Sequence, residues 1–274
     1  MSSPYKKIFI LTLFLIIITL NFNFRAFANN IKTLSTDYEK TTIKPISYKK
    51  ENIKIIEPID SFYKDLKNFI NHNYGNSINP GASLLAFQND NPILSINYHF
   101  SAISKIPLAS VSKTFTAVLV LKLEEKGYLN ISDSVSKYFP VYRKYEKHLG
   151  PITIKDLLSH TSGIPYNTRY IYDDGYSLPE PIFTKGNYHY SNHNYILLSL
   201  LIEKITQKPF KELIQQYIIN AIDLKQTELA SYLTGSSGII SNAYDLTNFC
   251  QYLLNDYQIR KENSYLYRMI YISN

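Results

Sequence analysis

Apolar and polar positions along the chain follow helical spacing in some segments and strand spacing in others. Residues 58–72 carry apolar side chains at helical intervals, which predicts a helix with one buried face. Two apolar runs at residues 81–87 and 92–98 flank a polar turn, which predicts a β-hairpin. Further helices are expected at residues 133–140, 153–160, 195–205, 210–220 and from residue 242. The pattern therefore combines many helices with at least one antiparallel pair of strands.

One helix has apolar residues on most of its sides, and we expect it to lie at the centre of the fold. It begins near Ser110 and ends at a glycine cap, Gly127. Ser110 would sit in its first turn and Lys113 one turn further on the same face. A serine hydroxyl attacks when a base takes its proton, and burial together with the positive helix N-terminus favours the neutral, basic form of a lysine. Backbone N–H groups of this turn could also face a developing oxyanion.

The S-x-x-K pattern formed by Ser110 and Lys113 is not unique in the chain. It also begins at Ser3, Ser47, Ser61 and Ser134. Only the Ser110 copy opens a long apolar helix, and that context supports nucleophilic catalysis. An ordinary core helix whose first turn carries capping Ser or Thr residues remains the alternative.

Composition narrows the class of protein. The 274 residues are 45% hydrophobic and 19% charged, which is typical of a globular chain of one large or two small domains. The net charge of +7 comes without a basic cluster interleaved with aromatics, so nucleic-acid binding is not predicted. Cys250 is the only cysteine and is expected to be a buried core residue. The six histidines show no zinc spacing, so neither a metal nor another cofactor is predicted.

The N-terminus resembles a secretory signal peptide over residues 1–28. Lys6 and Lys7 precede an apolar run at residues 8–20, and Ala26-Phe27-Ala28 fits cleavage before Asn29. The run is shorter than the roughly 20 residues that span a bilayer, which disfavours an uncleaved anchor. We expect a secreted or periplasmic protein that meets the membrane only through this peptide, with a flexible lead-in at residues 29–57 and a folded domain at 58–274.

Two later segments are expected to border a site. Residues 166–186 have no clear periodicity and are expected to form a long loop, and long ordered loops often carry function. Residues 234–241 are rich in Gly and Ser and are expected to form a turn ahead of the last helix.

Four motifs together resemble the penicillin-recognising serine hydrolases, the family of class C β-lactamases, DD-peptidases and related esterases. The resemblance covers roughly residues 58–260, and the motifs occur in the family's order: A-S-V-S-K-T-F-T around Ser110, D-L-L-S-H-T-S-G-I-P from Asp156, Y-S-N from Tyr190, and G-I-I-S from Gly238. The resemblance implies an α+β, β-lactamase/transpeptidase-like fold. It also implies acyl transfer through a serine ester on a small molecule or a peptidoglycan peptide.

The resemblance also implies a role for individual residues. Ser110 resembles the acylated nucleophile and Lys113 its proton-accepting partner. Tyr190 resembles the tyrosine that shares the proton shuttle and protonates the leaving group, and Asn192 resembles the side chain that contacts the substrate amide and the lysine. The H-T-S-G run at residues 160–163 is interpreted as the turn that ends a helix, structural and not catalytic.

The family's third motif, K-T-G or H-x-G on a late strand, is not found before Asn274. We therefore expect a truncated family member with a largely present helical subdomain and an incomplete antiparallel sheet, of which only the strands near residues 81–98 remain. The motifs favour an exported serine hydrolase acting on a cell-wall peptide or a β-lactam amide. Two alternatives stay open: a non-catalytic remnant or binding protein, and an esterase.

Overall fold

The computed structural model describes residues 64–65, 67–69, 71–72, 82–88, 91–173, 175–263 and 269. The predicted signal peptide at residues 1–28 and the lead-in at 29–57 lie outside these residues and stay predictions. The described residues between 64 and 72 are helical, as the apolar spacing there predicts. No helix in the described part of the chain combines the length and the apolar composition needed to cross a membrane.

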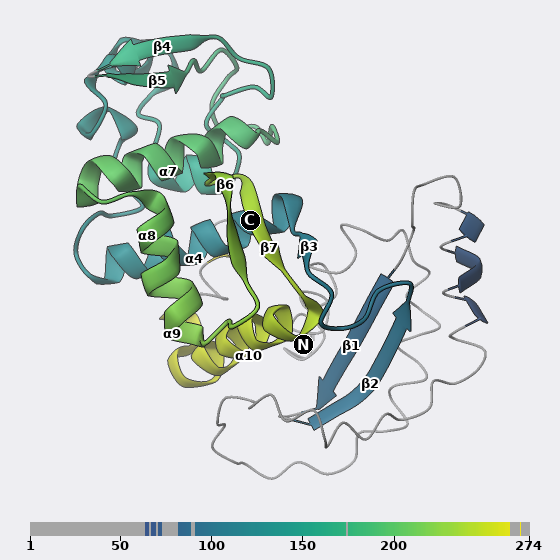
Figure 1. Cartoon of the computed structure of the whole chain (residues 1–274). Helices are drawn as coiled ribbons and strands as arrows, with labels where there is room; N and C mark the ends of the chain where they lie inside the picture. Colours follow the sequence, from purple (N-terminus) through teal and green to yellow (C-terminus); the bar gives the residue numbers. More distant parts are fainter. Residues whose placement is uncertain are drawn as a thin grey trace, which may run out of the picture. The chain divides into compact units, whose positions relative to one another are not determined.

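Helices and short antiparallel strands alternate along the chain, which confirms the α+β fold (Figure 1). The α-helices are α4 (Ser112–Glu125), α5 (Arg143–Leu149), α6 (Ile154–Leu158), α7 (Asn192–Thr206), α8 (Phe210–Ile214), α9 (Asn220–Ile222) and α10 (Ala243–Arg260). The 3-10 turns are η2 (Ala109–Val111), η3 (Val135–Lys137), η4 (Pro140–Tyr142) and η6 (Lys261–Asn263), and η5 (Gln215–Ile219) is a π-helical turn. The strands are β1 (Ala82–Gln88), β2 (Asn91–Tyr98), β3 (Ile106–Pro107), β4 (Tyr170–Asp173), β5 (Tyr176–Pro179), β6 (Glu228–Thr234) and β7 (Ser237–Ser241).

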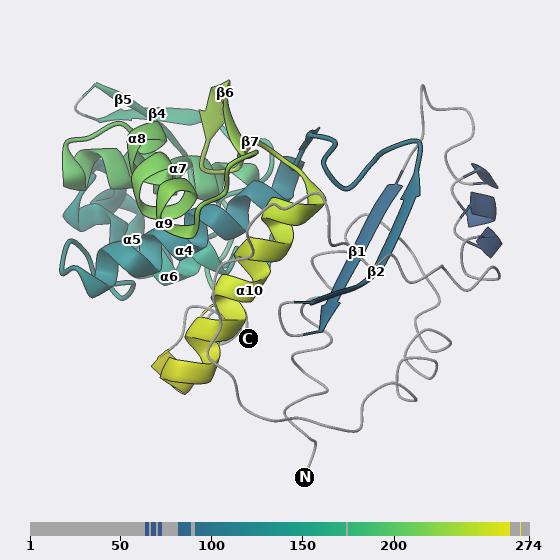
Figure 2. The same ribbon diagram turned by 60° about the horizontal axis from the view of Figure 1, so that its bottom comes forward.

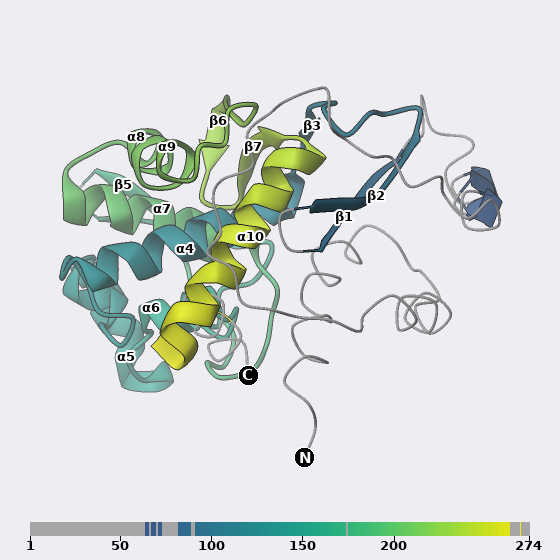
Figure 3. The same cartoon turned by 90° about the horizontal axis from the view of Figure 1, so that it is seen from below.

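Helix α4 is the central helix that the apolar pattern predicts. It packs against α7 and α8, and α10 crosses it, as Figures 2 and 3 show. The fully buried side chains of α4 are Phe115, Val118, Leu119, Val120, Leu121 and Leu123. Phe115 stacks on Phe249 of α10 with ring centroids 4.1 Å apart. Each such side chain contributes about 1.5–3 kcal/mol when buried, so α4 is firmly held at both faces.

The end of α4 is set by Gly127, as expected from the sequence. Gly127 has φ +78°, its N–H donates to the carbonyl of Glu124, and the N–H of Tyr128 donates to that of Leu123. This pair of bonds is the Schellman arrangement, which satisfies carbonyls that the helix leaves open and favours glycine at the left-handed position.

The expectation that only the strands near residues 81–98 remain is wrong. The β1–β2 hairpin forms as predicted, but there are two further sheets in the described residues: β3-β7-β6 and β4-β5, both antiparallel. Residues 228–241, read partly as a Gly/Ser turn, form the β6–β7 hairpin. These strands are short and mix polar with apolar residues on both faces, so their period of two is hidden in the sequence.

Other segments also differ from the expectation, and the helix predicted at residues 133–140 is only the 3-10 turn η3. The predicted long loop at residues 166–186 contains the β4–β5 hairpin, in whose turn Gly175 has φ +79°. Helix α5, which has no buried residue, has no counterpart among the predicted helices, because an exposed helix carries no apolar stripe. The helix predicted at residues 210–220 is present as α8 and α9 joined by the π-turn η5.

Candidate active site

Ser110 lies in the short turn η2, which leads directly into α4. The sequence places Ser110 in the first α-helical turn, but the structure puts it in a 3-10 turn one step earlier. Ala109 before it has φ +45°, a conformation that a non-glycine residue adopts at a cost of order 1–3 kcal/mol and that often occurs at active sites. The turn leaves the Ser110 side chain exposed at the N-terminus of the central helix.

Lys113 stands one turn further along and is buried, with 6% of its surface exposed. Its ammonium donates to three oxygens: Asn192 Oδ1 at 2.8 Å, the Ser236 carbonyl at 3.0 Å and Ser110 Oγ at 3.3 Å. An ammonium has three donors, so all of them are used. The amine is thus fixed beside the Ser110 hydroxyl, as the predicted Ser–Lys pair requires.

The β6–β7 hairpin supplies the Ser236 carbonyl and presses closely on the site. Gly235 has no room for a side chain, since a Cβ there would lie 1.9 Å from the carbonyl oxygen of Tyr195 in α7. The Gly235 carbonyl in turn accepts a hydrogen bond of 2.8 Å from Thr116 Oγ1 of α4. Because Gly235 touches both helices, the hairpin places Ser236 against Lys113 with little freedom.

Tyr190 and Asn192 flank the N-terminus of α7, which Ser191 caps. The Ser191 hydroxyl accepts from the N–H of His193 and donates to the carbonyl of Pro165 at 2.8 Å, and Ser191 is fully buried. Tyr190 OH lies 2.7 Å from Ser110 Oγ, and its ring centroid is 5.1 Å from the Lys113 ammonium. The structure thus brings Ser110, Lys113, Tyr190 and Asn192 together, as the sequence reasoning predicts.

A buried polar network lies directly behind Tyr190. Ser162 Oγ donates to Asn194 Oδ1 at 2.6 Å, and the Asn194 amide and the Ser191 N–H both reach His160 Nδ1, at 3.1 and 3.2 Å. His160 is 8% exposed, and the other three are fully buried. Burial, helped by the nearby Lys113 ammonium, lowers the pKa of His160 to about 4, so its imidazole is neutral at physiological pH.

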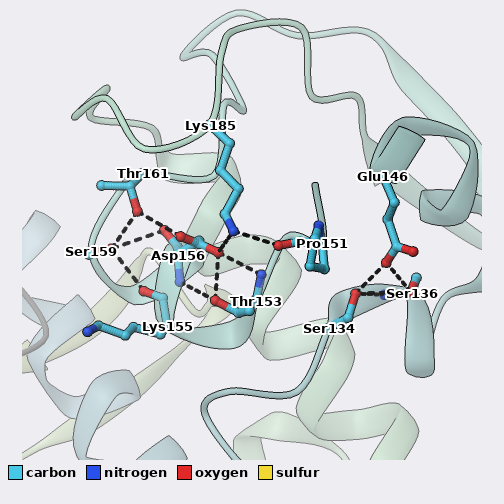
Figure 4. A network of polar contacts seen from close by, with 10 residues as sticks. All are labelled: Ser134, Ser136, Glu146, Pro151, Thr153, Lys155, Asp156, Ser159, Thr161 and Lys185. Carbon is cyan, nitrogen blue, oxygen red and sulfur yellow. Dashed lines mark hydrogen bonds and ion pairs between the residues drawn. The ribbon is translucent and has the colours of Figure 1, made fainter. Parts of the chain in front are cut away.

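A second polar network, shown in Figure 4, braces the segment that leads to Tyr190. Asp156 forms a capping box with Thr153 at the start of α6, its Oδ1 accepts from Thr161, and its Oδ2 pairs with Lys185 at 3.1 Å. Lys185 also donates to the carbonyl of Pro151 at 2.6 Å. The ion pair therefore joins the 181–190 segment to the N-terminus of α6.

The S-x-x-K copy at Ser134 has a purely structural environment in the same figure. Ser134 caps η3 by accepting from the N–H of Ser136, and both hydroxyls donate to Glu146 of α5. These two hydrogen bonds hold the pKa of Glu146 below its ordinary value. No site residue takes part, so this copy is a capped turn. The copies at Ser3, Ser47 and Ser61 begin outside the described residues.

Two groups of the site were not predicted as parts of it. His160 was interpreted as part of a structural turn, and it does end α6, but its imidazole also packs on Tyr190 with ring centroids 4.7 Å apart. The Ser236 contact is made by a backbone carbonyl, which has no signature in the sequence. The neighbouring Gly235 is the one signal that a close approach occurs there.

Other chemistry-bearing residues stay outside the site. Cys250 is half-buried, and desolvation raises the pKa of its thiol to about 11, so the thiol stays protonated at neutral pH. Among the residues that the structure describes, no three His, Cys, Asp or Glu side chains cluster as metal ligands would. His193 Nε2 lies 2.7 Å from the hydroxyl of Tyr170, with which it forms a hydrogen bond.

Comparison with known proteins gives a consistent picture. The model of the Beta-lactamase family matches residues 72–265 of the chain. Protein flp of Staphylococcus aureus strain MW2 is 31% identical over 192 residues, covering 60% of this chain and 38% of that protein. The chain therefore spans well under half the length of this relative.

Solved structures share the fold at low sequence identity. The octameric penicillin-binding protein homologue from Pyrococcus abyssi has a TM-score of 0.57 at 21% identity, covering 74% of this chain and 58% of that one. The beta-lactamase/D-alanine carboxypeptidase from Pseudomonas syringae has a TM-score of 0.57 at 19% identity, covering 77% of this chain and 68% of that one. At such identities the likeness concerns the fold alone.

Proposed function

This chain belongs to the Beta-lactamase family, and on that premise we propose that it is an exported serine hydrolase that works through an acyl-enzyme on Ser110. The observation that carries the proposal is the contact of Ser110 Oγ with both Tyr190 OH, at 2.7 Å, and Lys113 Nζ, at 3.3 Å. A nucleophile within hydrogen-bond reach of a base that is itself oriented by a third group is the arrangement that covalent catalysis needs.

In the proposed first step, Ser110 Oγ attacks the carbonyl carbon of the substrate and gives up its proton. The phenol oxygen of Tyr190 is the proposed acceptor, because it lies 2.7 Å from Ser110 Oγ, whereas Lys113 Nζ lies at 3.3 Å and, as an ammonium that donates to three oxygens, cannot accept a proton. Tyr190 accepts the proton as the phenolate, and the Lys113 ammonium lies 5.1 Å from the centroid of its ring. The proton then passes to the leaving nitrogen or oxygen as the bond to the carbonyl carbon breaks.

The second step is hydrolysis of the Ser110 ester by water: Tyr190 takes the proton from the attacking water and returns it to Ser110 Oγ as the ester bond breaks, which releases the acid and restores the serine. Asn192 holds the lysine through its Oδ1, which leaves its amide N–H groups on the side of Tyr166, whose hydroxyl lies 3.4 Å from Nδ2. The Asn192 side-chain amide would donate to the carbonyl of a substrate amide. The Ser110 N–H is the candidate oxyanion donor from η2, since the N–H groups of Val111 and Ser112 donate to backbone carbonyls.

We propose a cell-wall peptide or a β-lactam as the substrate class, because penicillin-binding and carboxypeptidase proteins share the family and the fold. Export follows from the predicted signal peptide at residues 1–28, which would bring the enzyme to such substrates. An esterase acting on a simpler acyl donor and a non-catalytic binding protein of the same family are the alternatives that the experiment distinguishes.

The test is acylation by a fluorescent penicillin, read by gel fluorescence and by intact mass. The chain is expressed with its own N-terminus, so the same mass shows whether cleavage occurs before Asn29. We expect one penicilloyl adduct, absent in Ser110→Ala, and Ser134→Ala serves as the matched control that keeps full labelling. Labelling only by a simple activated ester would favour the esterase. No adduct with either reagent, from protein that circular dichroism shows to be folded, would favour the non-catalytic protein.

A further inference from the structure

His160 holds the chain on both sides of Tyr190. Its carbonyl accepts the N–H of His189 at 2.8 Å, and its Nδ1 accepts the N–H of Ser191 at 3.2 Å. The imidazole packs against the Tyr190 ring between these two bonds, at 4.7 Å between centroids. One residue thus fixes the backbone before the tyrosine, the backbone after it and the face of its ring.

The tautomer of His160 follows from its partners. A backbone N–H can only donate, so Nδ1 must be an acceptor and the neutral ring carries its proton on Nε2. The Asn194 amide donates to the same atom while its oxygen accepts from Ser162. The Ser191 N–H and the Asn194 amide can both donate to Nδ1 only while His160 is neutral, and buried networks lose much of their stability when one member is mismatched.

The charges around His160 also favour its neutral form. Lys113 of α4 is the cation whose field reaches it, and the phenol rings that pack on it in the described part of the chain are those of Tyr188, Tyr190 and Tyr195. No carboxylate is among these described neighbours to stabilise an imidazolium. Protonation at Nδ1 would place a donor against two donors and a second cation near Lys113.

We propose that His160 is a positioning residue that fixes the Tyr190 hydroxyl over Ser110 and works only as the neutral imidazole protonated at Nε2. The proposal rests on the proposed function and deepens it. His160 touches neither the nucleophile nor the lysine, so it acts through Tyr190. It also contributes its own backbone shape, since His160 has φ +60°, where asparagine is among the residues that best replace it.

The test compares His160→Asn and His160→Ala in the full chain. Asparagine tolerates the left-handed backbone, its Oδ1 takes the place of Nδ1 as acceptor, and it does not titrate. Alanine keeps neither the acceptor nor the ring. We expect the acylation rate constant at saturating fluorescent penicillin to fall by about 10²-fold in His160→Ala, with the apparent Kd of the probe unchanged, because the phenol is misplaced. The acylation rate constant of His160→Asn is expected to be at least about tenfold higher than that of His160→Ala.

The pH profile separates positioning from a merely structural role. In the wild type the rate constant should fall as the pH decreases through about 4, where the imidazole gains its proton. His160→Asn should lack this acid limb, whereas His148→Asn on the exposed face of α5 should keep it. Circular dichroism at each pH restricts the comparison to folded protein. A wild-type rate constant in His160→Ala, or an unchanged acid limb in His160→Asn, would overturn the proposal.

If no probe acylates the wild type, that result contradicts the proposed function but says nothing of His160. A second measurement, which needs no acylation, then tests the role of His160. Long-range nitrogen–proton spectra of histidine-labelled protein report the tautomer and charge of each ring, with the His160 signals assigned from their loss in His160→Asn. We expect His160 to be neutral with its proton on Nε2 at pH 5 and to lose a ring-current shift in Tyr190→Leu. An Nδ1-protonated ring, or a titration near the ordinary value of about 6.5, would refute the proposal that a neutral His160 positions Tyr190.

Discussion

The two halves of the site are positioned by different means. Ser110 and Lys113 are three residues apart and share one continuous turn and helix, so local backbone geometry brings them together, and Asn192 and the Ser236 carbonyl then hold the ammonium. Tyr190 follows Ser110 by 80 residues and reaches it through the His160 network and the cap of α7. The nucleophile side therefore depends mainly on the apolar burial of one helix, with the β6–β7 hairpin as a further support. The tyrosine side depends on a set of buried polar bonds that must all be satisfied together.

The largest effect is expected from Lys113→Met, which removes the charge from the nucleophile side and leaves the tyrosine side in place. Methionine fills a similar volume, but it leaves Asn192 Oδ1 and the Ser236 carbonyl without the donor that Lys113 supplies. We expect acylation of Ser110 to slow by about 10²–10⁴-fold, because the cation beside Ser110 and Tyr190 is lost, and the unfolding free energy to fall by about 1–3 kcal/mol. Intact-mass time courses with the fluorescent penicillin measure the rate.

The matched control for Lys113→Met is Lys122→Met on the same helix. The pKa of Lys122 is lowered mainly by desolvation, so this variant also removes a partly buried lysine, but Lys122 packs over Tyr252 rather than Ser110. It should acylate at the wild-type rate. If Lys113→Met stayed within tenfold of the wild type, the short Ser110–Tyr190 contact would be sufficient for activation, and the contrast between the two halves would have to be redrawn.

The same difference explains how much of the site the sequence could predict. The Ser–Lys pair and the central position of α4 follow from the apolar pattern, because both are local features of one segment. Tyr190 and Asn192 follow only from the resemblance to a family, since nothing in the spacing of 80 residues predicts contact with Ser110. Their roles in catalysis stay predictions, and the structure shows that Tyr190 contacts Ser110 and that Asn192 contacts Lys113.

The parts that sequence reasoning missed depend on tertiary contacts. The sequence predicts only a turn at His160, because a position just after a helix is enough to account for the residue. Its packing on the Tyr190 ring is a tertiary contact that forms only when α7 is in place. The Ser236 carbonyl has no side-chain signature at all. The β4–β5 and β6–β7 hairpins are made of short mixed strands that gain stability by pairing and packing, so their periodicity is weak.

A second test addresses the hairpin that clamps the lysine. In Gly235→Ala the new methyl would lie 1.9 Å from the Tyr195 carbonyl oxygen, so the hairpin must move away from α7. Overpacking of this kind costs about 1–3 kcal/mol of unfolding free energy. Because the Ser236 carbonyl moves with the hairpin, we also expect slower acylation per folded molecule. Urea unfolding and the acylation time course measure the two effects separately.

Gly127→Ala provides the comparison for Gly235→Ala. A methyl at Gly127 meets no atom within 4 Å, but its φ of +78° strains any L side chain by about 1–2 kcal/mol. The two variants should thus lose similar stability, and only Gly235→Ala should lose acylation rate. An equal rate in both variants would show that the hairpin carbonyl does not help to hold Lys113.

The smallest effect is expected on the outer support of the tyrosine side. Lys185→Met breaks the pair with Asp156 and the bond to the Pro151 carbonyl, and both charged groups are partly exposed to solvent. Pairs of this kind contribute about 0.2–1 kcal/mol, so the unfolding free energy should fall by about that amount. The Tyr190 segment keeps its backbone bonds to residues 160–163, from Gly186 to Thr161 and from His189 to His160, and acylation should stay close to the wild-type rate.

The control for Lys185→Met is Lys137→Met, which breaks a more exposed pair with Asp133 at the start of η3, away from the tyrosine segment. Both variants should lose little stability, and raising the salt concentration should reduce the difference between each of them and the wild type. A large loss of acylation in Lys185→Met alone would mean that the backbone bonds at residues 160–163 do not suffice without the ion pair. Tyr190 would then be held from the surface inward, through Asp156 and Lys185, and His160 would be one support among several.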